Sequence, residues 1–220
     1  MLTDDTPPAR LPRLLEPVEI RVLGALLEKQ QATPEYYPLT TNALVAACNQ
    51  KSNRDPVMEL SAGEVESALE GLRKLVLVWR VGGSRAGKWE QNVEKRWSLD
   101  ATTKAVMTLL LLRGEQTPGE LRSRSDRLHP FETLEEVESA LARLADGLEP
   151  LAVELPRAPG QKETRWMHLV AGAPKVAAPG SPAPPPDRHE PLGSRVAALE
   201  TQVAALALEI SELRKKFGEV

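Results

Sequence analysis

The stretch Glu64-Val65-Glu66-Ser67-Ala68-Leu69 recurs unchanged, 72 residues later, as Glu136-Val137-Glu138-Ser139-Ala140-Leu141. Two shorter matches keep the same order along the chain: Thr33-Pro34 with Thr117-Pro118, and Arg96-Trp97 with Arg165-Trp166. Ordered matches of this kind are typical of internal duplication. The sequence therefore predicts two related units, residues 16–99 and residues 100–170.

Working outward from the first copy, Ser61 and Glu64 form a capping box that starts a helix over residues 61–75. Apolar residues at helical spacing predict an earlier helix over residues 17–30, and Thr41 can cap a short one that ends at Cys48. β-Rich runs over residues 76–81 and 89–99, separated by a glycine-rich turn, predict a hairpin.

The second unit repeats this order. Asp100 and Thr117 cap the first two helices, and Thr133 with Glu136 forms the capping box of the third. A hairpin follows, with strands over residues 151–155 and 164–169 around the Pro159-Gly160 turn. Three helices followed by a hairpin is the winged-helix order. We expect a mainly α protein with small β-hairpins, an α+β fold built from two tandem winged-helix domains.

The remaining segments flank these units. Residues 1–15 are polar and proline-rich and predict a flexible leader. Residues 171–193 contain mainly Pro, Ala and Gly, which cannot bury enough surface to fold, so a disordered linker is expected.

Residues 194–220 show a heptad pattern. The a positions hold Val196, Val203 and Ile210, and the d positions hold Leu199, Leu206 and Leu213. β-Branched residues at a with Leu at d favour a parallel two-stranded coiled coil. Self-association through residues 194–217 is therefore expected. The alternative is a single helix that packs on the body of the protein, because several alanines widen the apolar stripe.

Composition narrows the class of protein. The 220 residues carry a net charge of −3 and one cysteine, which suits a reducing compartment. The sequence contains neither a signal peptide nor an apolar run of membrane-spanning length, so we expect a cytoplasmic protein that is not bound to a membrane. His129, His168 and His189 are widely separated, so we expect no metal, no cofactor and no enzymatic activity. The lone thiol of Cys48 is interpreted as filling a helix face, with a low-pKa thiol as the weaker alternative.

Candidate nucleic-acid contacts gather in the first unit. The corner between its second and third helices holds Asn49, Gln50, Lys51, Asn53 and Arg54, and the hairpin holds Arg85 and Lys88. Such side chains can bind phosphates or base edges of duplex DNA. Two structural alternatives stay open. The corner side chains can hydrogen-bond their own backbone, and the hairpin charges can blunt an edge strand.

Charge on the third helices argues against base readout. Both carry excess Glu, which a helix entering the major groove should not bring to phosphates. The first hypothesis is therefore a dimeric DNA-binding regulator that contacts phosphate through the first unit. The second is a protein-interaction scaffold that does not bind DNA.

The run Cys48-Asn49-Gln50-Lys51-Ser52-Asn53-Arg54 is the most specific part of a family resemblance. Together with Leu26-Leu27-Glu28-Lys29-Gln30 and Tyr37-Pro38-Leu39, it resembles the YceH family of bacterial proteins over residues 16–170. The resemblance implies a tandem winged-helix fold. It implies little about activity, because the biochemical role of that family is not established.

Overall fold

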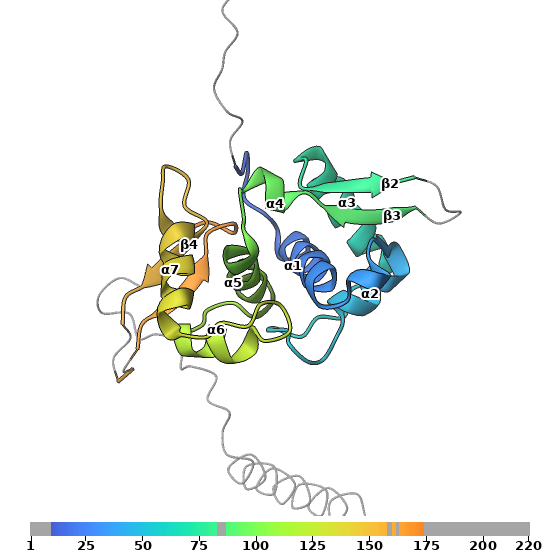
Figure 1. Ribbon diagram of the computed structural model, residues 1–220. Coiled ribbons are helices and arrows are strands. Elements are labelled where there is room, and N and C mark those ends of the chain that lie inside the picture. Colours follow the sequence, from blue (N-terminus) through green and yellow to red (C-terminus); the bar gives the residue numbers. More distant parts are fainter. Residues whose placement is uncertain (1–9, 83–86, 158–159, 162, 174–220) are drawn as a thin grey trace, which may run out of the picture. The chain divides into compact units, whose positions relative to one another are not determined.

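In the computed structural model, the described residues are 10–82, 87–157, 160–161 and 163–173, and they belong to one compact unit (Figure 1). The predicted coiled coil lies wholly outside the described residues, as do residues 1–9 of the predicted leader and residues 174–193 of the predicted linker. Arg85 also lies outside them.

The first half of the unit contains helices and a small antiparallel sheet. In chain order its elements are α1 (Pro17–Ala32), the 3-10 turn η1 (Pro34–Tyr36), β1 (Leu39–Thr40), α2 (Thr41–Cys48), α3 (Ala62–Lys74), β2 (Val78–Val81), β3 (Lys88–Gln91) and α4 (Val93–Arg96). Strand β3 lies between β1 and β2, with Trp89 opposite both Leu39 and Arg80.

The second half repeats this arrangement with fewer strand residues. Its elements are α5 (Ala101–Arg113), α6 (Pro118–Arg124), α7 (Leu134–Ala145), β4 (Ala152–Leu155) and β5 (Arg165–His168). Strands β4 and β5 pair antiparallel, and Gln116 forms an isolated bridge with Trp166. The described residues therefore form an α+β structure with seven α-helices and two small antiparallel sheets.

The repeated hexapeptide lies on equivalent helices. Val65 and Leu69 of α3 are fully buried, and so are Val137 and Leu141 of α7. Ser61 and Thr133 each accept a hydrogen bond from the backbone N–H three residues later, which caps the two helices. The repeat thus places the same apolar stripe in each half's core.

The two shorter matches do not correspond in space. Thr33 precedes the turn η1 without a side-chain cap, whereas Thr117 caps α6. The structural counterpart of Thr117 is Thr40, which caps α2. Arg96-Trp97 lies at the end of α4, because the strand predicted over residues 89–99 ends at Gln91, whereas Arg165-Trp166 lies in β5. The counterpart of Trp166 is Trp89, since each pairs with the residue just before the capping threonine.

Helices α1 and α5 pack against each other at the centre of the unit. Nine consecutive residues of α1, from Glu19 to Leu27, are buried, as expected for a helix covered on all sides. Gly24 permits this close approach, since a Cβ there would lie 2.8 Å from Cδ2 of Leu112. One continuous apolar core therefore serves both halves.

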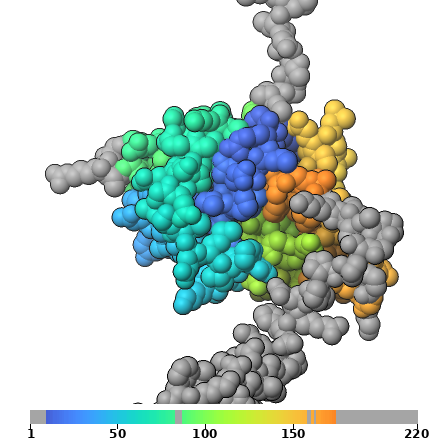
Figure 2. Space-filling view, turned by 180° about the vertical axis from the view of Figure 1, so that it is seen from behind, coloured from blue at the N-terminus to red at the C-terminus, as the bar shows by residue number. Residues whose placement is uncertain are grey.

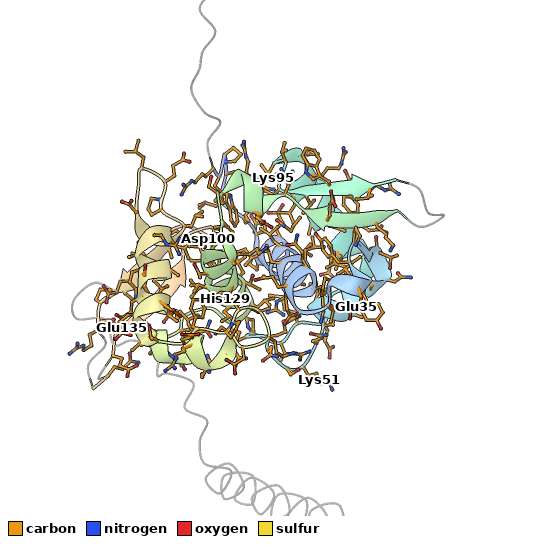
Figure 3. The ribbon with its side chains drawn as sticks, viewed as in Figure 1. Glu35, Lys51, Lys95, Asp100, His129 and Glu135 are labelled. Atoms are coloured by element: carbon orange, nitrogen blue, oxygen red, sulfur yellow. The ribbon has the colours of Figure 1, made fainter. Side chains whose placement is uncertain are left out.

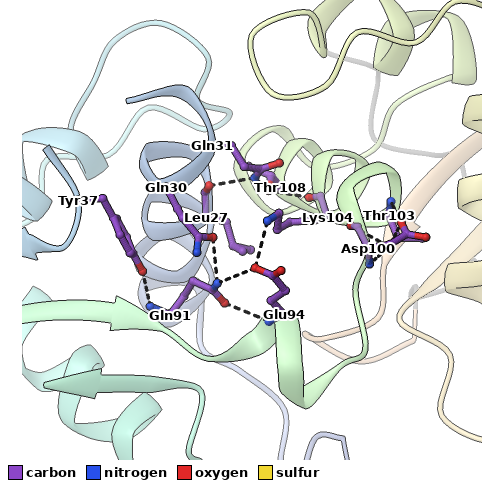
Figure 4. A network of polar contacts seen from close by, with 10 residues as sticks. All are labelled: Leu27, Gln30, Gln31, Tyr37, Gln91, Glu94, Asp100, Thr103, Lys104 and Thr108. Carbon is purple, nitrogen blue, oxygen red and sulfur yellow. Dashed lines mark hydrogen bonds and ion pairs between the residues drawn. The ribbon is translucent and has the colours of Figure 1, made fainter. Parts of the chain in front are cut away.

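A polar network continues the contact between the halves (Figure 4). Gln31 of α1 donates to Oγ1 of Thr108 in α5 at 2.9 Å. Lys104 of α5 forms an ion pair with Glu94 of α4 at 3.0 Å. The halves are joined by both apolar packing and hydrogen bonds.

Candidate nucleic-acid interface

Arg54 is a structural residue of the first corner, which we define as residues 49–56. Its side chain is 0% exposed and forms a bidentate ion pair with Glu28 of α1, at 2.6 and 3.0 Å. The guanidinium also donates to the Ala47 carbonyl oxygen at 2.8 Å and to Oε1 of Gln50 at 3.0 Å. These contacts support a structural role for Arg54, because its donors are used inside the protein, and its contact with DNA stays a prediction.

Three further corner residues also have internal partners. The Asn49 amide exchanges two hydrogen bonds of 2.8 Å with the backbone of Leu60. Gln50 accepts from Arg54, and Oδ1 of Asn53 accepts from Nη1 of Arg113 in α5 at 2.8 Å. Asn53 adopts a φ of 57°, a left-handed conformation that Asn tolerates well. These contacts support the structural interpretation of Asn49, Gln50 and Asn53.

Lys51 remains as the cation that the first corner presents to solvent. It is exposed and points away from the ribbon (Figure 3), and it forms no ion pair with a carboxylate in the described part of the chain. Lys88 is half-buried in β3, away from the residues that surround Lys51. Of the predicted site residues that the structure describes, Gln50, Lys51 and Asn53 line one groove, whereas Lys88 lies elsewhere.

A groove of about 490 Å³ runs beside Lys51, and both halves line it. We call it the basic groove. Its lining residues are Glu28, Lys29, Ala32, Thr33, Gln50, Lys51, Ser52, Asn53, Leu109, Leu112, Arg124, Arg127 and Leu128. Figure 2 shows from behind how the segment near residues 51–60 adjoins the second half, consistent with the 2.9 Å hydrogen bond from Asp55 N–H to the Leu112 carbonyl.

Two of the four cations in the basic groove have carboxylate partners. Lys29 lies 3.5 Å from Glu28, and Arg124 lies 3.4 Å from Glu120. Arg127 is exposed and, like Lys51, has no ion pair within the described residues. Helices α1 and α6 both end near the groove, so Lys29 and Arg124 offset the partial negative charge of their terminal carbonyls. Lys51 and Arg127 are the surplus positive charge.

The sequence did not indicate that Lys51 and Arg127 would line the same groove. Arg127 stands out in the sequence as part of an arginine-rich turn in the second unit. Its proximity to Lys51 depends on the packing of α1 against α5, which the local patterns do not report.

The third helices present the opposite charge. Exposed Glu64 and Glu66 lie on α3, and exposed Glu135, Glu136 and Glu138 lie on α7. A second hollow, of about 390 Å³, is lined by Glu66 and Glu70 together with Thr40, Thr41, Asn42, Arg80, Gly87 and Trp89. The exposed surfaces of α3 and α7, the helices that come before the two hairpins in the chain, are therefore acidic.

Cys48 is not a reactive thiol in this environment. Burial raises its pKa to about 12, against the smaller opposing effect of the nearby Arg54 and Arg21. Its side chain fills the apolar face of α2, as the sequence favoured.

Neither a metal cluster nor a membrane-spanning helix is found in the described ranges. No three His, Cys, Asp or Glu side chains in these ranges gather so that they could hold a metal ion. No helix within them combines the length and the apolar character needed to cross a bilayer.

Fold and groove together define a class: a duplicated α+β protein whose halves share one core and one basic groove. The family model described as "Protein of unknown function, DUF480" matches residues 15–161. A UPF0502 protein of Geobacter sulfurreducens is 48% identical over 201 residues, covering 91% of this chain and 90% of the relative. UPF0502 proteins of Azoarcus sp. and Burkholderia lata are 47% and 43% identical, covering 92% and 98% of this chain and 91% and 94% of their own lengths.

The chain belongs to the DUF480 family, whose curated members carry the name UPF0502. This is the YceH family that the sequence resembled, so that expectation is confirmed.

Proposed function

We propose that this chain is a non-enzymatic, tandem winged-helix protein that binds the phosphate backbone of duplex DNA through the basic groove. One observation supports the proposal most directly. Two cations without a carboxylate partner among the described residues, Lys51 from the first half and Arg127 from the second, line the same groove. The winged-helix assignment rests on the first half, where the helices α1, α2 and α3 are followed by the hairpin β2-β3, and β1, from between α1 and α2, completes a sheet of order β1-β3-β2.

Phosphate contact is favoured over base readout by the distribution of charge. The acidic side chains on α3 and α7 would repel DNA in the position where a helix-turn-helix protein inserts its recognition helix. The basic groove lies apart from these faces, since none of its lining residues belongs to α3 or α7. Contacts to phosphates position a protein on DNA without reading its sequence.

The rigid contact between the halves supports a two-point contact with DNA. Asn53, two residues after Lys51, accepts a hydrogen bond from Arg113 of α5, and α1 packs directly on α5. Lys51 and Arg127 are therefore held in a fixed relation, which lowers the entropic cost of binding two phosphates at once. Pairing through residues 194–217 would place two such grooves on one DNA molecule and raise their effective concentration.

The test is a gel-shift series with generic duplex DNA and full-length protein at increasing salt. The double substitution Lys51→Glu with Arg127→Glu should weaken binding at least about tenfold and lower the salt slope by about 1.8. The matched control reverses Lys95 and Arg157, which are also exposed and lie outside the groove. Lys95 and Lys51 are at opposite ends of the unit in Figure 3.

If the control pair weakens binding as much as the groove pair, the groove is not the contact surface. Undiminished binding by the groove variant leads to the same conclusion.

A second candidate, a protein-interaction scaffold, is favoured by one observation. Glu66 and Glu70 border a hollow in which Arg80 already lies over the Trp89 ring, 5.9 Å from its centroid, and the two carboxylates would suit a basic side chain of a partner. Failure to bind DNA even at low salt, with co-purification of a partner that Glu66→Lys removes, would support this function over DNA binding.

A further inference from the structure

A separate cavity of about 210 Å³ lies between the two halves of the unit. Its walls are formed by Pro17, Ile20 and Arg21 of α1, by Asp55, Pro56 and Met58, by Leu111 of α5, by Gly114 and by His168 of β5. None of these residues lines the basic groove. The cavity is therefore a distinct candidate site.

Arg21 is a buried cation without a buried counter-charge. It is 2% exposed, and its guanidinium donates only to the carbonyl oxygens of Cys48, at 3.2 Å, and Pro56, at 2.6 Å. Its Nε has no hydrogen-bond partner, and no carboxylate among the described residues forms an ion pair with it. Asp55 acts on Arg21 electrostatically but forms no ion pair with it. Burying a charge without a directly paired anion is costly, and a ligand carboxylate at the guanidinium would relieve that cost.

His168 contributes unused hydrogen-bonding capacity to the same cavity. It is 9% exposed, and its buried Nδ1 has no hydrogen-bond partner. Buried polar atoms are nearly always satisfied in folded proteins. Two buried side chains with unsatisfied nitrogens, Arg21 and His168, thus line one small cavity.

The remaining walls supply an apolar surface and one anion. Ile20, Met58 and Leu111 are apolar, whereas Asp55 is exposed and forms no ion pair with the described cations. A simple carboxylic acid would satisfy Arg21 but would be repelled by Asp55. A molecule with an ammonium and a carboxylate attached to the same carbon, together with a short apolar chain, complements all of these groups.

We propose that this cavity binds a free α-amino acid with a short apolar side chain. The ligand carboxylate pairs with Arg21 and accepts a hydrogen bond from His168. The ligand ammonium pairs with Asp55, and the side chain packs on Ile20, Met58 and Leu111. Because α1 and β5 come from different halves, the bound amino acid joins the halves, and the inference does not depend on DNA binding.

The test uses full-length protein, with calorimetry and thermal unfolding, and leucine, valine and alanine as probes at up to about 10 mM. Two comparison compounds are 4-methylpentanoate, which is leucine without its amine, and isoamylamine, which lacks the carboxylate. We expect leucine or valine to bind and to raise the melting temperature, and both comparison compounds to bind at least about tenfold more weakly.

Three exposed or half-buried positions make the test specific without endangering the fold. Met58→Trp, which fills the cavity, should abolish binding, whereas Val57→Trp, on an exposed neighbour outside the cavity, should leave it unchanged. Asp55→Asn should weaken amino-acid binding about tenfold while leaving 4-methylpentanoate unaffected or improved.

Three results would overturn the proposal: no heat or thermal shift with any amino acid, equal binding by Met58→Trp and Val57→Trp, or equal affinity for leucine and 4-methylpentanoate. The last would remove the role of Asp55 and with it the zwitterionic ligand.

Discussion

The first corner and its counterpart in the second half, residues 125–133, which we call the second corner, are held in place by different contacts. Thirteen residues separate α2 from α3 in the first half, and nine separate α6 from α7 in the second. The longer connection is fastened by the buried Arg54, paired with Glu28. In the shorter one, the exposed Arg122 donates to the carbonyl oxygens of Phe131 and Glu132.

This difference teaches that a basic corner is not by itself a binding surface. In both corners an arginine donates hydrogen bonds to backbone carbonyl oxygens: Arg54 to that of Ala47, in the last turn of α2, and Arg122 to those of two residues that precede α7. Within the described connections 49–61 and 125–133, Lys51 and Arg127 are the cations that remain exposed and without an ion pair.

The sharpest way to break the comparison is to remove Arg54. Arg54→Met leaves the Glu28 carboxylate without its main partner and should lower the free energy of unfolding by about 3–5 kcal/mol. Urea unfolding measures this, with Lys51→Met as a neighbouring control that should change stability by less than about 0.5 kcal/mol. The double variant with Glu28→Gln should cost less than the sum of the single changes. Additive effects would mean that the pair does not act as a unit.

A pH titration separates the halves in a second way, because the second half buries a neutral His168. Burial lowers the pKa of this imidazole to about 4, compared with about 6.5 in the unfolded chain. The unfolded state therefore binds the proton more readily. The stability that depends on neutral His168 is fully present above pH ~6.5 and is lost as the pH falls toward 4, by up to about 3 kcal/mol.

Comparing the pH dependence of unfolding for the wild-type chain and His168→Gln isolates this contribution. The difference between the two curves should grow as the pH falls from 6.5 to 4. Parallel curves would show that His168 is not buried in its neutral form.

Gly24→Ala tests whether the halves are as tightly joined as the α1–α5 contact indicates. The new Cβ lies 2.8 Å from Leu112, so α1 and α5 must shift, and a loss of about 1–2 kcal/mol is expected despite the better helix propensity of Ala. Gly63→Ala is the matched control, because its Cβ meets nothing within 4 Å. That variant should be neutral or slightly more stable, and the same loss in both would disprove the close approach.

The smallest effect is expected at the second corner. Arg122→Ala removes two hydrogen bonds from an exposed side chain and should cost about 1 kcal/mol or less. Measured beside Arg54→Met, it gives the difference between the two corners directly. A cost as large as that of Arg54→Met would make the corners energetically equivalent.

The sequence predicted the parts of the fold that depend on local spacing. The hexapeptide repeat and the capping residues Ser61 and Thr133 located α3 and α7, because burial there follows from a helical stripe within a dozen residues. The predicted capping box forms at α3 alone of the two, since the Glu136 carboxylate accepts from the Glu132 N–H. The Thr-Pro and Arg-Trp matches misled because a two-residue match carries no record of strand pairing. Thr40 and Thr117 are equivalent only through the bridges that Trp89 and Trp166 make to the residues before them.

The candidate site was harder to predict for a similar reason. Arginine is a residue type usually found on the surface. The cost of burying the charge of Arg54 is offset by its ion pair with Glu28, 26 positions earlier in the chain. Arg127 and Lys51 line one groove only because the two halves pack together. Side chains whose role depends on such distant partners carry no signal in the local pattern.

The shared helical centre has a practical consequence for dissecting this protein. Cutting the chain near Leu99, where the sequence suggests a domain boundary, would separate α1 from α5. Each fragment would then expose to solvent the apolar helix face that the other half covers. Such fragments should aggregate rather than fold independently. Assays on isolated halves would therefore measure the effect of the lost core packing and not a property of the native protein.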